Sequence, residues 1–483
     1  MTAAIPIALR CADRLRAKVR YVFDTLLLAG GIGGRFVPEP PAEGPWVLYG
    51  SADGVSGSAL ARCLAITHTS EVWQLFEAAS DVTSVADIDG LAAVFPARGP
   101  VPTAAAVLPF DLIANAFYFL SSWSERVSGG GRRTYDRSVF ARLGIPQDIV
   151  DRYLGRLMAS LSALCESLGR MGPQPVPWPE GGRFALVLSH DVDFLPNGTG
   201  DVVKQGCKTI ARHLLHHRDP ADAARAAAGL LKALATGRDP YGCVPEIIAR
   251  EKELGVRSSF QVAVGHRHPN DVNYRIEDDR VRDYLRVISD AGFDLCLHGS
   301  YRSTENAAWY GEEAELLAAR LGRPRGSRQH FLSFDYDALF AAQERAGIRY
   351  DMSMGFPDRP GPRAGFSYPY FPYCLEEDRP FDVLQISLFL MDVTLRGYLG
   401  LKGAAARRII EDIVRDLCEK RGCVSAVWHP IVFGGARDPG YDRLYWDMIE
   451  SVRDKGGLAT DGRAINAFWR QRAQRSASFA GVS

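Results

Sequence analysis

The chain has 483 residues, of which 47% are hydrophobic and 24% are charged, values typical of globular proteins that bury a sizeable core. Lysine plus arginine (57) balances aspartate plus glutamate (57), so no overall field directs the chain toward nucleic acid or an anionic membrane. At roughly 100 to 200 residues per domain, the length accommodates two or three domains and excludes a bare motif or a single zinc finger.

The cysteines and the apolar stretches bear on the cellular compartment in which the chain is expected. The nine cysteines include no CxxC pair, and their odd number argues against a secreted disulfide framework or a Cys-rich zinc cluster. The apolar run within residues 1–10 is too short for a secretory signal. The stretch 21–36 is interrupted by Asp24 and several glycines, and it falls short of the roughly 20 residues that span a bilayer. We therefore expect no transmembrane segment and a cytoplasmic location.

The first 165 residues mix short strands and helices. Residues 46–49 predict a strand, and residues 110–123 predict an apolar helix. We interpret residues 1–165 as a smaller α/β domain of unknown role. Residues 172–179 contain four prolines, a composition that excludes helix and central strand. Residues 166–182 are therefore predicted to be a Pro-rich linker.

From residue 183 to residue 475 the pattern alternates between apolar strands and helices. Strands are expected at 184–189, 259–264, 293–297, 330–334, 350–354, 383–390 and 423–428, with helices such as 312–321 and 404–419 between them. An insertion at 201–234 is predicted to form two helices. Repeated strand and helix units imply parallel strands with both faces covered. Both an open doubly wound sheet and a closed barrel fit this pattern, and seven or eight units favour a (β/α) barrel, regular or distorted.

Polar residues cluster at the ends of these predicted strands. His190-Asp191-Val192-Asp193 follows the first strand, His298 follows the third, Arg328-Gln329-His330 opens the fourth, and His429 closes the seventh. The carboxyl ends of parallel barrel strands converge on one face, where active sites are built. The preceding domain shows no comparable cluster, so we expect a catalytic face on the barrel.

These residue types suit metal-assisted hydrolysis. One carboxylate and two imidazoles can bind a divalent ion, most plainly Zn²⁺, through three protein ligands. The fourth position of the ion then stays open for water. A second carboxylate can then accept the proton of that water, and a further histidine can protonate the leaving group.

The motifs resemble those of a known family, the NodB-homology polysaccharide deacetylases of carbohydrate esterase family 4. The likeness covers about residues 183–469, and the N-terminal domain loosely resembles the leading domain of a bacterial subgroup. The resemblance implies Asp191 as general base, Asp193 and His298 as metal ligands, and His429 as general acid. It also implies that Arg328 orients Asp191.

The second motif departs from the family pattern. The family has a histidine five positions into this motif, whereas this chain has Arg302, which stays protonated and cannot coordinate a metal. We expect His330 to replace it as the third ligand. Tyr301, Asp351 and Arg363 are further expected to line the substrate cleft, although a loop salt bridge is an equally open reading of Asp351 and Arg363.

The resemblance implies a hydrolase of carbon–nitrogen bonds that removes N-acetyl groups from an amino-sugar-containing polysaccharide or its precursor and releases acetate. The expected cofactor is Zn²⁺ or another divalent ion, and the expected partner is an N-acetylated glycan or glycan precursor. Two alternatives stay open. One is a different metal-dependent amidohydrolase that acts on a small substrate from the same barrel, and the other is a non-catalytic glycan-binding protein.

Overall fold

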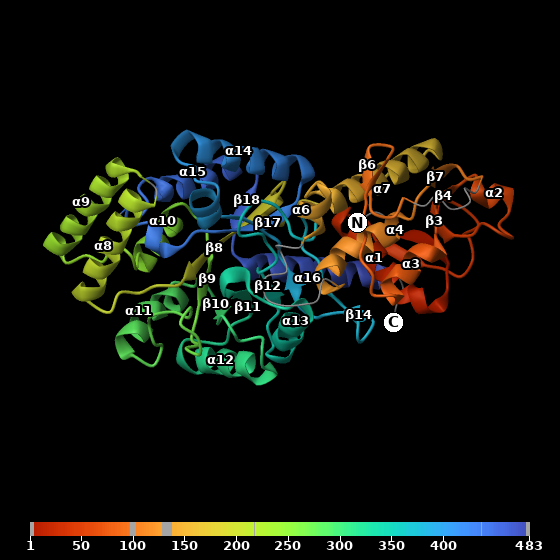
Figure 1. Ribbon diagram of the computed structural model, residues 1–483. Helices are drawn as coiled ribbons and strands as arrows, with labels where there is room; N and C mark the ends of the chain where they lie inside the picture. Colours follow the sequence, from red (N-terminus) through yellow and green to blue (C-terminus); the bar gives the residue numbers. More distant parts are fainter. Residues whose placement is uncertain (1–3, 97–102, 128–137, 217, 436, 480–483) are drawn as a thin grey trace.

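The computed structural model describes residues 4–96, 103–127, 138–216, 218–435 and 437–479. Figure 1 shows two α/β parts packed side by side, with the N-terminal part in red and orange on the right and a larger barrel on the left. Within the described residues, no helix is both long enough and apolar enough to cross a membrane.

The N-terminal part is built on a parallel sheet with the strand order β2-β1-β3-β4-β7. Its strands are β1 (Ile5–Arg10), β2 (Gly34–Phe36), β3 (Trp46–Gly50), β4 (Cys63–Ile66) and β7 (Ala106–Leu108), and β5 (Ala86–Ile88) and β6 (Leu91–Ala93) form a separate antiparallel pair. The strand expected at 46–49 is confirmed. Alternate residues of β3 enter different cores, because successive side chains point to opposite faces. Trp46 and Leu48 pack on one face, and Val47 and Tyr49 on the other.

Helices complete this part. They are α1 (Arg16–Ala29), α2 (Gly57–Leu60), α3 (Ser70–Glu77), α4 (Leu112–Leu120), α5 (Trp123–Val127), α6 (Val139–Leu143) and α7 (Ile149–Ser167). The apolar helix expected at 110–123 corresponds to α4 and the start of α5. Its beginning is set by Asp111, whose side chain accepts a hydrogen bond from the backbone N–H of Ala114, the usual role of a helix N-cap.

The larger part is a curled sheet of parallel strands. They are β8 (Ala185–Val192), β9 (Ser259–Val262), β10 (Asp294–Gly299), β11 (Gly326–Gln329), β12 (Tyr350–Asp351), β15 (Leu384–Gln385), β16 (Leu388–Met391), β17 (Cys423–Val427) and β18 (Leu458–Thr460), and β13 (Tyr373–Cys374) and β14 (Arg379–Pro380) form a separate antiparallel pair. The order within the sheet is β15-β12-β11-β10-β9-β8-β17-β16, with β18 also paired to β8.

The two edges of this sheet are joined by one short stretch of chain. Only Ile386 and Ser387 separate β15 from β16. Ile386 donates its backbone N–H to Asp351 on one side (2.9 Å), and Ser387 accepts from Ser425 on the other (2.8 Å). Consecutive residues thus link the first and last strands of the order. The expected (β/α) barrel is confirmed.

Helices surround the barrel on the outside (Figure 1). They are α8 (Thr199–Leu215), α9 (Pro220–Thr236), α10 (Val244–Glu253), α11 (Asp279–Asp290), α12 (Ala307–Arg320), α13 (Tyr336–Arg345), α14 (Gly403–Lys420), α15 (Tyr441–Asp454) and α16 (Gly462–Phe479). The insertion expected to form two helices is the α8–α9 hairpin, at the end of the barrel farthest from the N-terminal part.

One strand prediction was wrong and one strand was missed. The strand expected at 330–334 lies earlier, because β11 ends at Gln329 and His330–Leu332 form a tight turn. Phe331 and Leu332 have positive φ values of 58° and 51°, which a strand cannot contain. The sequence pattern also missed β18, since its three residues are too few to show a periodicity.

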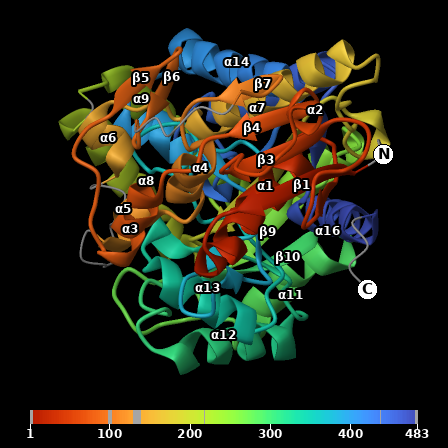
Figure 2. The same ribbon diagram turned by 90° about the vertical axis from the view of Figure 1, so that its right-hand side faces the viewer.

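The two parts share one hydrophobic core. Side chains of α1, α4 and α7 belong to the same buried cluster as Tyr350 of the barrel and Trp469 of α16. Figure 2, which views the molecule from the N-terminal side, shows α16 close to α1 and β1. Trp178, in the Pro-rich stretch, stacks on Trp469 with ring centroids 5.5 Å apart. The Pro-rich stretch is therefore packed into the junction between the two parts.

Candidate active site

Strand alternation decides which residues of β8 point into the barrel. Leu186 and Leu188 pack with the outer core under α14 and α15. His190 lies on the same face of β8, and its Nε2 is 3.0 Å from Oε1 of Glu251 in α10. Ser189 and Asp191 therefore point to the interior. This assigns His190 to a buried network outside the barrel and Asp191 to the site.

Arg328 of β11 holds Asp191 in place. Its Nη1 donates to Asp191 Oδ1 at 2.5 Å, its Nη2 donates to Ser189 Oγ at 2.8 Å, and its Nε donates to the carbonyl of Met352 at 2.9 Å. The Arg328 side chain is fully buried. A planar guanidinium fixed by three neighbours orients a carboxylate strongly.

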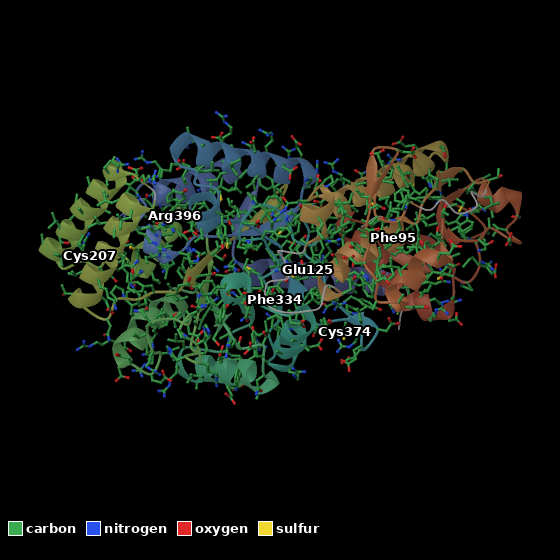
Figure 3. All side chains as sticks on the ribbon, in the orientation of Figure 1. Phe95, Glu125, Cys207, Phe334, Cys374 and Arg396 are labelled. Carbon is green, nitrogen blue, oxygen red and sulfur yellow. The ribbon has the colours of Figure 1, made fainter. Side chains whose placement is uncertain are left out.

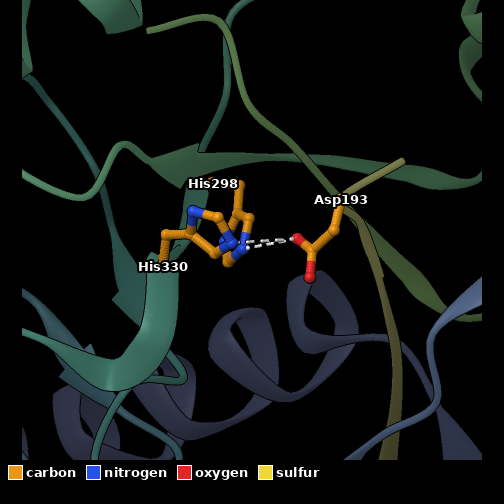
Figure 4. Close-up of side chains that lie close together, drawn as sticks. All are labelled: Asp193, His298 and His330. Atoms are coloured by element: carbon orange, nitrogen blue, oxygen red, sulfur yellow. Dashed lines mark ion pairs between the residues drawn. The ribbon is translucent and has the colours of Figure 1, made fainter. Parts of the chain in front are cut away.

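Asp193, His298 and His330 converge on one point (Figure 4). Their donor atoms all lie within 4.8 Å of one another. His298 Nε2 is 3.2 Å and His330 Nε2 is 3.5 Å from Asp193 Oδ1. These candidate ligands come from the segment after β8, from β10 and from the turn after β11. In the sheet β10 and β11 are adjacent and β9 lies between β8 and β10, so strands of one region deliver all three residues to the carboxyl edge of the sheet.

The donor set fits a divalent ion. Asp193 Oδ1 and His298 Nε2 are buried and have no hydrogen-bond partner among the described residues. Donors bound to one tetrahedral Zn²⁺ at about 2.1 Å are separated by about 3.4 Å, close to the two distances above. Two imidazoles and one carboxylate are ligands that Zn²⁺ accepts in catalytic sites with an open position.

Local contacts orient His298. Its Nδ1 lies 2.9 Å from the carbonyl oxygen of Arg328, so the ring presents Nε2 to Asp193. Burial alone would lower the pKa of His298, but the carboxylates of Asp191 and Asp193 raise it above the usual value. Burial would raise the pKa of Asp193, yet His330 and His298 hold it well below its usual range. The pocket thus favours positive charge at this point.

His429 faces the same carboxylate from the other side. It follows β17, and its Nε2 lies 3.4 Å from Asp193 Oδ2. Its Nδ1 lies 2.7 Å from Asp392 Oδ1, and its backbone N–H donates to Asp392 Oδ2 at 3.1 Å. Burial would lower the pKa of His429, but Asp392 and then Asp193 and Asp191 raise it to about 9.

Sequence reasoning missed Asp392. It comes directly after Met391, the last residue of β16, and so obeys the rule that selected the other site residues. Burial would raise the pKa of Asp392, but the charge of His429 lowers it. We describe Asp392 as a positioning residue, since its carboxylate holds both the ring and the backbone N–H of His429.

A cavity of about 310 Å³ opens over these residues. Its walls include Asp191, all three candidate metal ligands and His429. Two aromatic side chains that line it, Phe331 and Tyr398, are 56% and 52% exposed. Phe331 holds this position through its left-handed backbone (φ 58°), a conformation that costs energy in a bulky residue and clusters at functional sites. The volume is at the lower end of ligand pockets, which span roughly 300 to 1,000 Å³.

Tyr301 and Asp351 are not among the residues that line this cavity. The Tyr301 ring stacks on His268 with centroids 4.5 Å apart and meets the cavity-lining Phe331 edge-on at 5.5 Å. Asp351 is fully buried and accepts hydrogen bonds from Gln343 and Ser353. Burial raises the pKa of Asp351 to about 6.

Of the two readings left open for Arg363, the structure contains a salt bridge. Arg363 Nε and Nη2 donate to the two carboxylate oxygens of Glu125 of α5, at 2.8 and 2.6 Å. Figure 3 shows Glu125 beside Phe334 in the middle of the molecule, and the Arg363 guanidinium lies 4.9 Å from the centre of the Phe334 ring. Arg363 therefore joins the two parts of the chain.

The unusual Arg302 does not line the cavity that contains the candidate metal ligands. Its side chain is 47% exposed, and its Nε lies 3.5 Å from Glu305. His330, which follows the next strand, lies with its Nε2 3.5 Å from Asp193 Oδ1.

No protein-family model matches the chain, and no curated protein matches its sequence. Among solved structures, the chain is similar to a candidate polysaccharide deacetylase from Mycobacterium smegmatis, with 17% identity and a TM-score of 0.40 over 63% of this chain and 93% of that one. It is also similar to the Puue allantoinase, with 15% identity and a TM-score of 0.39 over 61% and 92% of the two chains. The YdjI aldolase from Escherichia coli K12 matches with 11% identity and a TM-score of 0.21 over 62% and 92%. Similarities this distant support no conclusion about function, which must therefore be argued from the geometry of the site.

Proposed function

We propose that this chain is a metal-dependent hydrolase of carbon–nitrogen bonds, and more narrowly an N-deacetylase of amino-sugar-containing glycans or their precursors. One observation carries the proposal. The group Asp193, His298 and His330 is flanked by two oriented proton carriers, Asp191 held by Arg328 and His429 held by Asp392. This is the arrangement that hydrolysis of an amide needs.

Asp193, His298 and His330 would hold the ion, which we propose to be Zn²⁺ from its preference for two imidazoles and a carboxylate. A divalent ion in such a site polarises a carbonyl oxygen and makes a bound water acidic. The positive charge favoured at this point of the pocket supports the assignment.

Asp191 acts as the general base in this proposal. Its Oδ2 lies 3.9 Å from His298 Nε2, and its Oδ1 is engaged by Arg328. Oδ2 is therefore the oxygen that accepts the proton of the attacking water. Arg328 prevents the carboxylate from rotating away from the ligands.

His429 acts as the general acid. Its raised pKa of about 9 keeps the imidazole protonated near neutral pH, so Nε2 can donate a proton to the departing amine. Asp392 fixes the ring through Nδ1 and the backbone, and its negative charge stabilises the protonated form.

The cavity supports a sugar substrate. Its volume of about 310 Å³ suits one acetamido sugar unit, and exposed Phe331 and Tyr398 offer apolar faces on which the neighbouring rings of a glycan can pack. Ligand sites commonly combine such aromatic walls with a few convergent polar groups. The motif resemblance supports the amide bond of the acetamido group as the bond that is hydrolysed.

The test measures acetate release from a panel of N-acetylated glycans by the full-length protein after chelation and after Zn²⁺ is added back. We expect release with added metal and none with chelator. The exposed His216, which directly follows α8, is not among the residues that line the cavity, so His216→Ala is a matched control for histidine removal. A protein that binds Zn²⁺ and glycan but releases no acetate would be a glycan-binding protein, and one that hydrolyses only small amides would be the alternative amidohydrolase.

A further inference from the structure

We propose that the substrate of this site carries an oxyanion, a carboxylate or a phosphate, which Arg437 and Arg396 bind at one end of the cavity. This inference rests on the proposed function and narrows its substrate class from N-acetylated sugars in general to acidic ones.

Both arginines line the cavity that contains the candidate metal ligands. Arg396 belongs to a π-helix, Thr394–Tyr398, that begins two residues after Asp392. Arg437 lies in the segment between His429 and α15. They thus belong to the side of the cavity formed after β16 and β17. Figure 3 shows Arg396 at the end of the barrel next to the α8–α9 hairpin.

Positive charge exceeds negative charge at this end of the cavity. Three arginines meet one buried carboxylate, Asp438. Arg212 of α8 lies 3.3 Å from Asp438 Oδ1, Arg396 Nη1 donates to Asp438 Oδ2, and Arg437 Nε lies 3.6 Å from the same oxygen. One carboxylate balances one guanidinium, so two positive charges stay uncompensated by it.

The other carboxylates of the cavity are already engaged. Asp191 pairs with Arg328, Asp392 pairs with His429, and Asp193 faces the two imidazoles. Among the described residues, no ion pair joins them to Arg396 or Arg437. Burial would lower the pKa of Arg396, but Asp438 and, at longer range, Asp392 raise it. Burial, and next the charge of Arg396, lower the pKa of Arg437, as expected where like charges crowd a poorly solvated place.

The arginines also have donors to spare. Among the described residues, the buried Nε of Arg396 has no hydrogen-bond partner, and the buried Nε of Arg437 approaches Asp438 Oδ2 at 3.6 Å, which is too long for a hydrogen bond. The Arg396 residue is 8% exposed, and a buried donor without a partner is costly. The contact between the hairpin and the barrel includes the Arg212–Asp438 pair and the backbone carbonyl of Arg437, which lies 2.9 Å from His213 Nε2 and 3.5 Å from Arg212 Nη2. These two contacts engage the backbone of Arg437 and not its guanidinium. An oxyanion would satisfy both charge and donors, because the guanidinium fork matches carboxylate and phosphate.

The test compares kcat/KM for three acetamido substrates, which are an oligosaccharide of N-acetylglucosamine, its counterpart with a uronic acid carboxylate, and N-acetylglucosamine 1-phosphate. The wild-type chain is expected to favour at least one anionic substrate by about 10- to 100-fold, the range of a charge-assisted hydrogen bond. The two anionic arms distinguish a carboxylate from a phosphate.

Arg437→Gln is expected to abolish this preference. Arg437 is chosen because its side chain is 24% exposed, so the variant has the better prospect of folding, which circular dichroism would check. Arg415→Gln on the outer face of α14, where Arg415 is 60% exposed, is the control and should keep the wild-type ratio. A wild-type ratio near one, or a ratio that survives in Arg437→Gln, would overturn the inference.

A binding measurement separates this inference from the proposed function. Calorimetric titration of the wild-type chain with glucuronate, glucose 1-phosphate and glucose uses probes without an acetamido group. Binding of an acidic probe that is lost in Arg437→Gln, with no acetate released from any substrate, would keep the oxyanion site and reject deacetylation. Acetate release at equal rates from neutral and acidic substrates would keep deacetylation and reject the oxyanion site.

Discussion

His429 and Asp392 are joined twice, once through the imidazole Nδ1 at 2.7 Å and once through the backbone N–H of His429 at 3.1 Å. One carboxylate therefore fixes both the ring and the chain that carries it. Because the two residues follow adjacent strands, β16 and β17, their relative position is set by the pairing of those strands.

Asp392→Asn should reduce kcat by about 10- to 100-fold, since positioned acid–base groups contribute about 10²- to 10⁴-fold and this variant only misorients one. KM and bound Zn²⁺ should stay near the wild-type values, because Asp392 is not among the candidate metal ligands. Steady-state kinetics and metal analysis check this. Loss of metal together with kcat would mean that Asp392 supports the ligands rather than His429.

Asp191→Asn should retain fold and metal but lose turnover by about 10²- to 10⁴-fold, because an amide cannot accept the proton of the attacking water. Acetate release and metal content measured on the same preparation provide the test. Wild-type turnover in this variant would end the assignment of Asp191 as the base.

His330→Ala should lose Zn²⁺, since it removes one of three protein ligands, while His216→Ala should keep it. Equilibrium dialysis followed by metal analysis measures the binding. The α/β fold should survive, because the His330 ring lies at the carboxyl edge of the sheet and the turn that carries it is not part of a strand. Unchanged metal content in His330→Ala would remove His330 from the site.

Glu125→Gln should lower the free energy of unfolding by about 3 to 5 kcal/mol, because it removes the carboxylate charge that pairs with the buried Arg363 guanidinium. The pair lies between the N-terminal part and the barrel, so both parts should lose stability together. Denaturant unfolding followed by two probes, one in each part, would show this. A transition that changed in one part alone would contradict the shared core.

The stability of the chain should fall as pH rises from about 4 to about 7. Burial raises the pKa of Asp151 to about 7, against hydrogen bonds from Ser367 that lower it. The native state then holds a proton that the unfolded chain has lost, so unfolding becomes more favourable as pH rises through this window. Asp151→Asn should flatten the slope of unfolding free energy against pH. Glu313 and Asp351, with pKa values raised by burial to about 7 and 6, would retain part of it.

The sequence predicts those site residues that follow long apolar strands. Asp191, His298 and His429 stand at the ends of runs whose alternation fixes their direction, so their meeting at one edge follows from the parallel sheet. Asp392 follows the same rule but was overlooked, because the expected strand 383–390 is in fact two short strands with a break between them.

Long-range pairs were beyond such reasoning. Arg363 and Glu125 form an ion pair although they are 238 residues apart in the sequence. No local sequence pattern predicts that contact. The exposed Phe331 and the cavity arginine Arg437 lie in irregular segments, whose paths depend on what packs around them rather than on a repeat. Their roles emerge only once the barrel has brought them to the cavity.

The link between β15 and β16 limits how this architecture can vary among descendants of the chain. Ile386 and Ser387 connect the two edges of the sheet and stand just upstream of Asp392. An extra residue there would shift the strand register and turn Asp392 toward the opposite face of the sheet. We therefore expect related chains to carry no insertion in this link. The α8–α9 hairpin lies outside the ring, and its length can drift without altering any pairing of strands.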